Sequence, residues 1–289
     1  MTAQFKNEEL ETLVYWITER DRIRALKETG APKPWTNDPL LRDHRWCNVR
    51  RMDDRVSRWL FEHWYDDRHD VEYQLLDAVL ARLINWPDAL AEITESRNPA
   101  DVRPILEARA KRGDKVFTGA YVIPGVPGKN KVDSIINLVA TVAIRSEEIT
   151  IDHPTMRGTW GKLMKFDGLG SFLSGQIVAD LAHQGLGMEW PDRFTWAPIG
   201  PGSARGINRL LGRPKDQAVT QTEFDRLLPG LMATLKPRVQ ALWKDRGLVA
   251  MDIQNCLCEF DKYRRLQLGE GKVRARYEGS GPGPQGALL

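Results

Sequence analysis

The sequence predicts a mainly α-helical fold, and three observations support this. Apolar residues recur at helical spacing along most of the chain, cap-forming residues flank many of these segments, and a single short segment has the composition of a β-strand. With 289 residues, 42% of them hydrophobic and ten of them Trp, the chain can bury a large core. We expect one domain over residues 1–277, either a single body or two interleaved lobes with the cleft between them. Residues 278–289, rich in Gly, Ser and Pro, are expected to be a flexible tail.

The first predicted helix begins at Asn7, a good N-cap with two Glu residues behind it. It should run to about Thr29, with Gly30 as its C-terminal stop. Residues 31–39 contain three prolines and cannot be helical. Helical periodicity then predicts further helices over residues 40–49, 54–65 and 71–84.

The next helix should begin with Asn98 as its cap and Pro99 as its first residue. Gly113 should close it, and Pro104 should kink it. Residues 115–123 carry the one convincing β signal, which predicts a short β-strand or hairpin.

The remaining predicted helices include residues 132–145 and 251–265. Between them, Thr220 begins a capping box that opens another helix. Pro229 and Pro237 should interrupt that helix, because proline lacks the backbone donor.

Residues 155–183 indicate two helices joined by the tight turn Asp167-Gly168-Leu169-Gly170. Gly168 and Gly170 lack a Cβ, so their amides can approach a DNA phosphate closely, and Lys165 adds a positive charge. This pattern resembles the helix-hairpin-helix with which DNA glycosylases hold a DNA backbone. The resemblance implies a DNA-glycosylase-like helical fold. A plain helix-to-helix turn with a glycine C-cap is the alternative.

A second glycine-rich turn precedes a helix predicted over residues 203–211. Free amides at a helix start bind anions, so the turn is a predicted site for an anion such as phosphate or pyrophosphate. Its residues are Gly200, Gly202, Ser203 and Arg205. Arg209 lies on the same helix face as Arg205 and is predicted to contact DNA. A turn that only caps the helix through Ser203 is the alternative.

DNA glycosylases carry an Asp in this region, which stabilises the cationic sugar left by base loss. The present chain has no carboxylate between Arg193 and Leu211. Asp192 is the residue that could fill the glycosylase role if the comparison is shifted. The turn is therefore better suited to an anion than to a carbocation.

Charge and cysteine content narrow the classes of function. The net charge of +3 permits nucleic-acid binding without requiring it, although basic residues cluster over residues 42–58 and 262–276. Three cysteines cannot build a disulfide framework, and no His or Cys pair has metal-ligand spacing, so no metal site is expected. No signal region and no long apolar run appear, which predicts a cytoplasmic protein without membrane contact.

A set of segments, spread in order over most of residues 19–277, matches a known family. These segments are Glu19-Arg20 with Ile23, residues 34–39, Asn48-Val49, Arg51, Asp54-Arg55, Ser57, and residues 117–121, 168–170, 200–203 and 258–263. They resemble phage DNA base-hypermodification proteins described as α-glutamyl/putrescinyl-thymine pyrophosphorylases or amino acid:DNA transferases. They are also similar to the helical domain that accompanies 5-hydroxymethyluracil DNA kinases.

The resemblance implies a DNA substrate and a transferase reaction. Thymine bases bearing a pyrophosphorylated 5-hydroxymethyl group would exchange pyrophosphate for an amine, either an amino acid or a polyamine. The amine is then a co-substrate, no cofactor is firmly implied, and a 5-hydroxymethyluracil DNA kinase is a candidate partner. The compartment would be the cytoplasm of an infected bacterial host if a phage encodes the chain. Kinase chemistry itself is not predicted, because the chain has no P-loop pattern.

Candidate catalytic residues follow from what this chemistry needs. The incoming amine must lose a proton, and Glu259 or Asp261 is the candidate base. Arg51, Asn48 and Tyr121 are candidates to hold the base edge or the carboxylate of an amino acid. Two other functions stay open at this point: a non-catalytic DNA-binding partner of the kinase, and an active DNA glycosylase.

Overall fold

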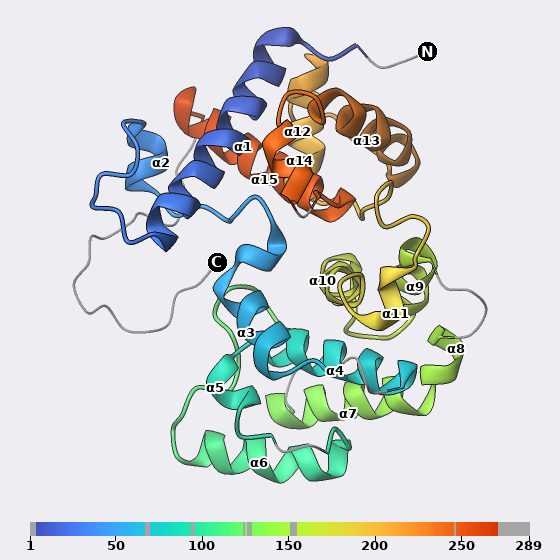
Figure 1. Ribbon diagram of the computed structural model, residues 1–289. Helices are drawn as coiled ribbons and strands as arrows, with labels where there is room; N and C mark the ends of the chain where they lie inside the picture. Colours follow the sequence, from blue (N-terminus) through green and yellow to red (C-terminus); the bar gives the residue numbers. More distant parts are fainter. Residues whose placement is uncertain are drawn as a thin grey trace. The chain divides into compact units, whose positions relative to one another are not determined.

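The computed structural model of the protein describes residues 4–66, 70–93, 96–123, 125, 129–150, 155–245 and 247–270. Over these residues the fold is helical and contains no β-strand, which confirms the predicted mainly α class (Figure 1). The chain groups into two compact units. Unit 1 combines the residues up to 54 with those from 194 onward, and unit 2 comprises residues 55–193. The predicted tail, residues 278–289, lies outside the described residues.

Unit 1 is built around its last helix, α15. Its helices are α1 (Asn7–Glu28), α2 (Pro39–Asp43), the 3-10 turn η1 (Arg51–Asp53), α12 (Pro201–Leu211), α13 (Gln221–Leu235), α14 (Gln240–Asp245) and α15 (Ala250–Gln267). Helix α15 contacts α12 most extensively and also packs against α1, α13 and α2 (Figure 1). Trp16, Phe224 and Phe260, one from each of three helices, are fully buried, so residues distant in sequence share one core.

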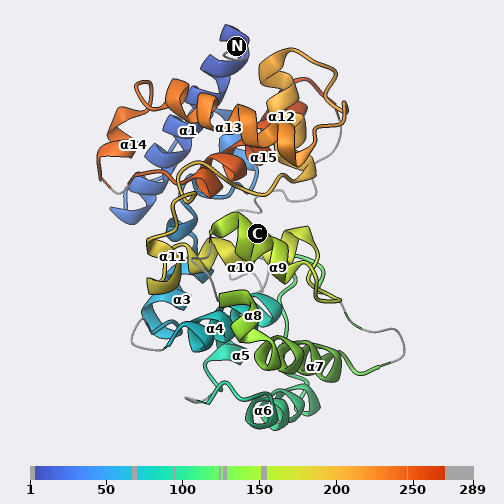
Figure 2. The same cartoon turned by 90° about the vertical axis from the view of Figure 1, so that its right-hand side faces the viewer.

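Unit 2 is organised around α4. Its helices are α3 (Arg55–His63), α4 (Val71–Ile84), α5 (Pro87–Leu90), α6 (Pro99–Lys111), α7 (Lys131–Ile144), α8 (Ser146–Thr150), α9 (Met156–Leu163), α10 (Ser171–Leu181) and α11 (Gly185–Met188). Helix α4 packs against α7 and α10, and α7 packs in turn against α6 (Figure 2). The apolar face of α4, including Leu75, Val79 and Leu83, is fully buried. Its predicted bounds are confirmed.

The predicted β segment at residues 115–123 is wrong. Its backbone bonds to helices instead of to a second strand: Thr118 N donates to Ile84 O over 2.9 Å, and Arg109 Nε donates to Lys115 O over 2.8 Å. Tyr121 donates its hydroxyl hydrogen to Arg82 O over 2.7 Å. The β-favouring side chains therefore anchor a connecting loop, because no neighbouring strand is present among the described residues.

Two helix predictions in unit 1 are also corrected. The helix expected over residues 40–49 ends at Asp43, after which the chain is extended and docks on α15. Pro229 does not interrupt α13, which continues to Leu235. Leu228 and Leu231, on either side of Pro229, are fully buried, so packing outweighs the lost backbone bond.

Smaller shifts occur at the helix starts. Helix α1 begins at Asn7 itself with Lys6 as its N-cap, and Gly30 beyond its end has a φ of +71°. Helix α12 begins at Pro201, two residues before the predicted start at Ser203. Thr220 caps α13 as expected, since its side chain accepts from Glu223 N over 3.1 Å.

The predicted helix pair around Gly168 is present as α9 and α10. Gly168 has a φ of +97°, a backbone conformation that glycine adopts without strain. Leu169 is buried in the turn, and its carbonyl accepts from Ser174 Oγ over 3.2 Å. Gly170 is the N-cap of α10, so the amides that follow it lie at a helix start.

Candidate functional site

The predicted pyrophosphate turn stands at the start of α12, where α12 packs closely on α15. A Cβ at Gly202 would lie 3.0 Å from both Cβ and Sγ of Cys258, and one at Gly206 would lie 2.4 Å from Leu257 O. Gly202 and Gly206 lie one turn apart on the same face of α12, and their lack of a Cβ allows α12 to approach α15 closely. Gly202 thus has a packing role in addition to its predicted role in anion binding.

The hydroxyl of Ser203 organises this turn from a buried position. It accepts from Gly200 N over 2.9 Å and donates to Gly200 O over 3.0 Å. Gln254 Nε2, from α15, also donates to it over 3.2 Å. The capping role considered for Ser203 is thus present. Pro201 has no backbone hydrogen, and the first helical bond runs from Ala204 N to Gly200 O over 2.9 Å, so the amides of Gly202 and Ser203 lie in the first turn.

Asp261 holds three arginines together on the α12 side of α15. Its carboxylate is fully buried. Arg205 Nε lies 2.7 Å from Oδ2, Arg209 Nε lies 3.0 Å from Oδ1, and Arg265 Nε lies 3.2 Å from Oδ2. We call these four residues the Asp261 cluster. The i, i+4 pairing of Asp261 with Arg265 and the shared face of Arg205 and Arg209 are both confirmed.

Arg209 extends the Asp261 cluster to a second carboxylate. Its Nη2 donates to Glu270 over 2.6 Å, and Lys215 Nζ lies 3.0 Å from the same oxygen. Hydrogen bonds from Arg209 and Lys215 lower the pKa of Glu270 to about 2. Arg209 is nearly buried, so its guanidinium is held inside unit 1 by two carboxylates.

Glu259 lies on a different face of α15, against the extended segment that follows α2. Its Oε2 accepts from Cys47 N over 3.2 Å and from Lys262 Nζ over 3.3 Å. Lys262 Nζ also donates to Arg45 O. The two candidate bases therefore have different surroundings: guanidinium groups around Asp261, and a backbone amide with one ammonium group around Glu259.

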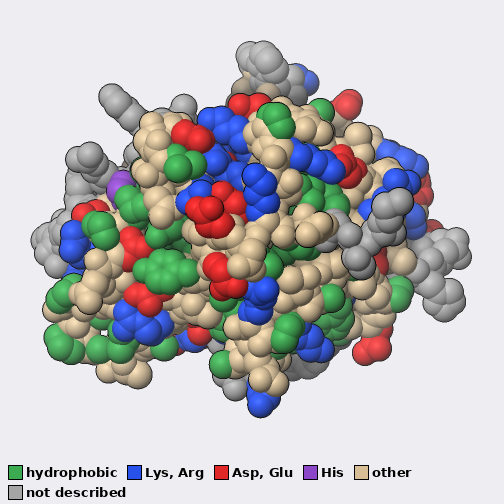
Figure 3. Space-filling model, turned by 90° about the horizontal axis from the view of Figure 1, so that it is seen from above, with side chains coloured by type: hydrophobic (Ala, Val, Ile, Leu, Met, Phe, Trp, Pro, Cys, Tyr) green, Lys and Arg blue, Asp and Glu red, His purple; other side chains and the backbone are tan. Residues whose placement is uncertain are grey.

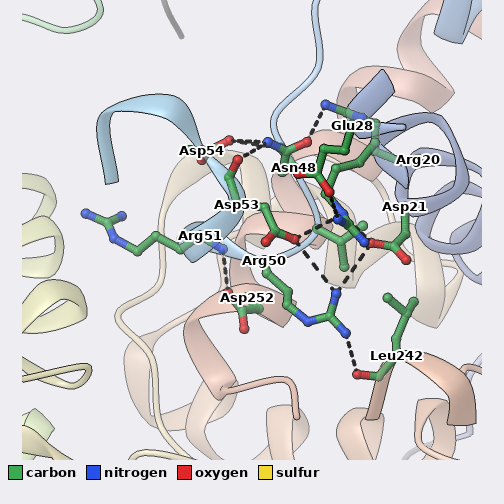
Figure 4. Close-up of polar contacts among 12 residues, drawn as sticks. Arg20, Asp21, Glu28, Asn48, Arg50, Arg51, Asp53, Asp54, Leu242 and Asp252 are labelled. Carbon is green, nitrogen blue, oxygen red and sulfur yellow. Dashed lines mark hydrogen bonds and ion pairs between the residues drawn. The ribbon is translucent and has the colours of Figure 1, made fainter. Parts of the chain in front are cut away.

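Asn48 belongs to a partly buried polar network in this segment (Figure 4). Its side chain accepts from Arg20 Nη2 over 2.6 Å and donates to Asp54 Oδ1 over 3.0 Å. Arg20 Nε donates in addition to Cys47 O over 2.9 Å. Burial lowers the pKa of Arg20 and raises that of Asp54. The Asn48 amide is thus committed to contacts that fix the 47–54 segment.

Arg51 is anchored by its backbone, and its side chain extends away from this network (Figure 4). Its amide donates to Asp252 Oδ1 over 2.9 Å, and Val249 N donates to Asp252 Oδ2 over 3.1 Å. Burial raises the pKa of Asp252 to about 6. Asp252 was not predicted as a site residue, because its partners lie 201 residues away as well as three residues before it.

The structure brings some predicted residues together and assigns others to separate units. Asn48, Arg51 and Glu259 belong to one connected region of unit 1, and Arg205, Arg209 and Asp261 to another. Gly200, Gly202 and Ser203 lie in unit 1 at the start of α12. The predicted residues of unit 2 are described only within it; they are Tyr121, Lys165, Gly168 and Gly170. There the Tyr121 ring lies edge-on to Phe172, with 5.2 Å between the ring centres.

Asp192, the residue considered for glycosylase chemistry, caps a helix in unit 2. Its two carboxylate oxygens accept from Met156 N over 2.8 Å and from Arg157 N over 2.9 Å. Both amides lie in the first turn of α9, where a carboxylate is favoured by the helix dipole.

Many members of the two basic sequence clusters are paired with acidic residues. The pairs include Arg42 with Asp43, Arg50 with Asp21, Lys262 with Glu259, Arg264 with Glu9, and Arg265 with Asp261. On the face seen in Figure 3, Lys and Arg side chains correspondingly lie among Asp and Glu side chains. Clustering in the sequence therefore does not translate into a surface of one sign on that face.

Two cysteines of α15 carry thiols of low reactivity. Burial raises the pKa of Cys258 to about 12 and that of Cys256 well above its usual value, so these thiols stay protonated at neutral pH. Within the described residues, no group of three or more His, Cys, Asp and Glu side chains could hold a metal ion. No helix among them is long and apolar enough to span a membrane.

Comparison with known proteins places this helical chain in a family. The family model described as "5-hmdU DNA kinase, helical domain" matches residues 7–273, so the chain belongs to that family. A curated relative, the 5-hmdU DNA kinase of Bacillus phage SP10, is 26% identical over 207 residues. That alignment covers 62% of this chain and 32% of the relative, so the chain matches about a third of the relative's length. No solved structure matches the chain.

Proposed function

We propose that the chain takes part in hypermodification of thymine in DNA, as a transferase that replaces pyrophosphate on a 5-pyrophosphoryloxymethyl-uracil base with an amine. Membership in the helical-domain family of 5-hmdU DNA kinases supports a modified thymine as the substrate. The observation that carries the transferase assignment is the start of α12, where the first-turn amide of Gly202 precedes Arg205 at the positive end of the helix. An amide donor and a guanidinium together suit an anionic leaving group.

The proposed step is a substitution at the 5-methylene carbon. A bond forms between the amine nitrogen and this carbon, and the carbon–oxygen bond to pyrophosphate breaks, so pyrophosphate leaves with the electron pair. The amine proton passes to a carboxylate base. Positive charge at the leaving group lowers the barrier only if it is in place before the bond breaks, which is the role proposed for Arg205.

Glu259 is the better candidate for the base. Both oxygens of Asp261 already face guanidinium nitrogens, and the carboxylate is fully buried. Glu259 has one oxygen in the bonds to Cys47 N and Lys262 Nζ. A proton acceptor needs an accessible lone pair, which favours Glu259 over Asp261.

The remaining predicted residues divide by their present contacts. Arg51 is proposed to bind the carboxylate of an amino-acid co-substrate, because a guanidinium can bind a carboxylate through two parallel hydrogen bonds. Asn48 fits a positioning role, since its amide fixes the segment that carries Arg51. Lys165, Gly168 and Gly170 are proposed to bind DNA phosphate. Tyr121 is proposed to hold the base edge or the carboxylate of the amino acid.

A mass-spectrometric assay tests the proposal. DNA carrying 5-pyrophosphoryloxymethyl-deoxyuridine is incubated with the protein and a mixture of amino acids and polyamines, then digested to nucleosides. An amine adduct supports the transferase, and abasic sites would indicate a glycosylase instead. Glu259→Gln should abolish adduct formation, whereas Glu11→Gln, at an exposed residue of α1, should leave it unchanged.

A second candidate is a non-catalytic DNA-binding partner of a 5-hydroxymethyluracil DNA kinase. It is favoured by the family's description as a helical domain and by the greater length of the phage relative. In the same assay this function would leave the base unchanged while the protein is retained on the DNA. Adding such a kinase with ATP to 5-hydroxymethyluracil DNA would then raise phosphorylation only when the chain is present.

A further inference from the structure

The Asp261 cluster contains two guanidinium groups whose donors are mostly unused. Arg205 and Arg265 each place Nε near the same carboxylate oxygen, Asp261 Oδ2, at 2.7 Å and 3.2 Å. A guanidinium has five N–H donors. No described residue accepts from the Nη1 or Nη2 atoms of either side chain, and about 30% of each side chain is exposed. Each therefore presents its terminal pair of nitrogens to solvent.

The shared oxygen also keeps the two arginines close together. Because both Nε atoms lie against Asp261 Oδ2, they are within about 6 Å of each other. Like charges at this separation repel, and an anion between them would relieve the repulsion. The two terminal edges offer four donor positions, which suits a phosphate group with several oxygens better than a single carboxylate.

The charge balance of the surroundings points the same way. Within the described part of the chain, Arg205, Arg209, Arg265 and Lys215 face the two carboxylates of Asp261 and Glu270. Four positive charges thus meet two negative ones, which leaves two positive charges uncompensated. Glu270 offsets one of the two charges of Arg209 and Lys215, and Asp261 offsets one of the two charges of Arg205 and Arg265, so one positive charge remains with Arg205 and Arg265. The Asp261 carboxylate is fully buried, whereas Arg205 and Arg265 are partly exposed. Its main effect is therefore to fix the positions of these two side chains and not to neutralise their charge.

We propose that Arg205 and Arg265 form a two-arginine clamp for pyrophosphate and that Asp261 is the positioning residue that holds them apart and in register. The identity of the anion rests on the proposed function, whereas the clamp itself rests on the geometry. Arg265 becomes an anion ligand alongside Arg205. Asp261 then acts through the arginines and not as a base.

Binding of inorganic pyrophosphate by isothermal titration calorimetry tests the clamp on the full chain without any turnover. Arg205→Gln and Arg265→Gln should each weaken pyrophosphate binding by at least about tenfold, and the double variant should not bind detectably. Arg226→Gln is the matched control, because Arg226 is an exposed arginine on α13 of the same unit. It should bind pyrophosphate like the unmodified chain.

Several outcomes would overturn the clamp. One is wild-type pyrophosphate affinity in Arg265→Gln, and another is an unmodified chain that binds glutamate but not pyrophosphate. Arg265→Lys keeps the charge but loses the planar fork, so an intermediate affinity supports the clamp and full affinity would reduce it to simple charge attraction. Thermal unfolding confirms that each variant is folded. If the chain bound pyrophosphate but transferred no amine, the proposed function would be wrong while the clamp would still be supported.

Discussion

Two buried carboxylates, Asp180 in unit 2 and Asp261 in unit 1, each hold arginine, and they do so in opposite ways. Asp180 binds Arg82 through both oxygens: Arg82 Nε contacts Oδ2, and Nη2 lies 2.6 Å from Oδ1. Arg82 Nη1 donates to Asn85 Oδ1 over 2.9 Å, and Nη2 also lies 3.3 Å from Ser57 Oγ. Tyr65 adds a hydroxyl donor to Asp180 over 2.6 Å.

The difference lies in which donors remain for something else. The Arg82 side chain is 5% exposed and all three of its nitrogens are bonded inside unit 2, whereas Arg205 is 30% exposed and bonded only through Nε. We call Arg82–Asp180 a closed pair, because all three nitrogens of the guanidinium group are bonded inside the fold. Such a pair stabilises a fold, because removing one partner leaves a buried charge. We call Arg205–Asp261 an open pair, because it leaves donors of the guanidinium group directed at solvent. The same residue types therefore make a structural anchor in one unit and a candidate anion site in the other.

The largest expected effect is the loss of the closed pair. Arg82→Ala leaves Asp180 buried without its guanidinium and should lower the free energy of unfolding by about 3 to 5 kcal/mol. Urea unfolding followed by circular dichroism measures this change. A loss well below 1 kcal/mol would show that the pair does not anchor unit 2.

Asp252 sharpens the comparison, because its carboxylate is buried with backbone amides as its hydrogen-bond donors. Its pKa, raised by burial from 3.8 to about 6, favours the protonated form in the folded state. Asp252 therefore does not lower the free energy of unfolding below about pH 4. As the pH rises to about 6 the buried carboxylate increasingly lowers this free energy, by about 3 kcal/mol in total. Asp252→Asn should remove this part of the pH dependence. Unfolding free energies at pH 4 and pH 7 test it, and an unchanged difference between them would exclude Asp252 as its source.

Gly206→Ala tests the close packing of α12 on α15, the two helices that carry Arg205 and Asp261. The added Cβ would lie 2.4 Å from Leu257 O and should destabilise the protein by about 1 to 3 kcal/mol. Gly230→Ala is the control, since Gly230 lies in α13 with nothing within 4 Å of an added Cβ. That change should stabilise the helix by about 0.5 to 1 kcal/mol. Equal effects of the two changes, measured by urea unfolding, would contradict close packing at Gly206.

The smallest expected change in stability is that of Arg205→Ala. Arg209 and Arg265 remain beside Asp261, and the lost pair is partly exposed, so unfolding should change by less than about 1 kcal/mol. The same urea titration used for Arg82→Ala provides the measurement. If Arg205→Ala destabilised the protein as much as Arg82→Ala, the distinction between open and closed pairs would fail.

Local sequence signals predicted much of the fold. Helix α4 has apolar residues at helical spacing along its whole length, and its bounds are as predicted. The loop at residues 115–123 was mistaken for a strand, because β-favouring residues there pack on helix ends at Arg82 and Ile84. Composition indicates the secondary structure that a segment favours, but it does not indicate which part of the fold the segment packs against.

The candidate site shows the same division. The Asp261–Arg265 pair was predictable, since four residues separate the two on one helix. The contact between Arg205 and Asp261 joins residues 56 apart, and Cys47 N reaches Glu259 across 212 residues. Such contacts depend on how helices pack, which the spacing of residues within one helix does not encode.

The interleaved order of the two units has a consequence for the newly made chain. Helix α1 packs against α15, although all of unit 2 lies between them in the sequence. Domains generally fold as units while the chain leaves the ribosome. Unit 2 can complete its core once residue 193 has emerged, whereas α1 must wait for α15. Helix α1, made before unit 2, is therefore among the last of these helices to find its partner, and its apolar face is open to other contacts during synthesis.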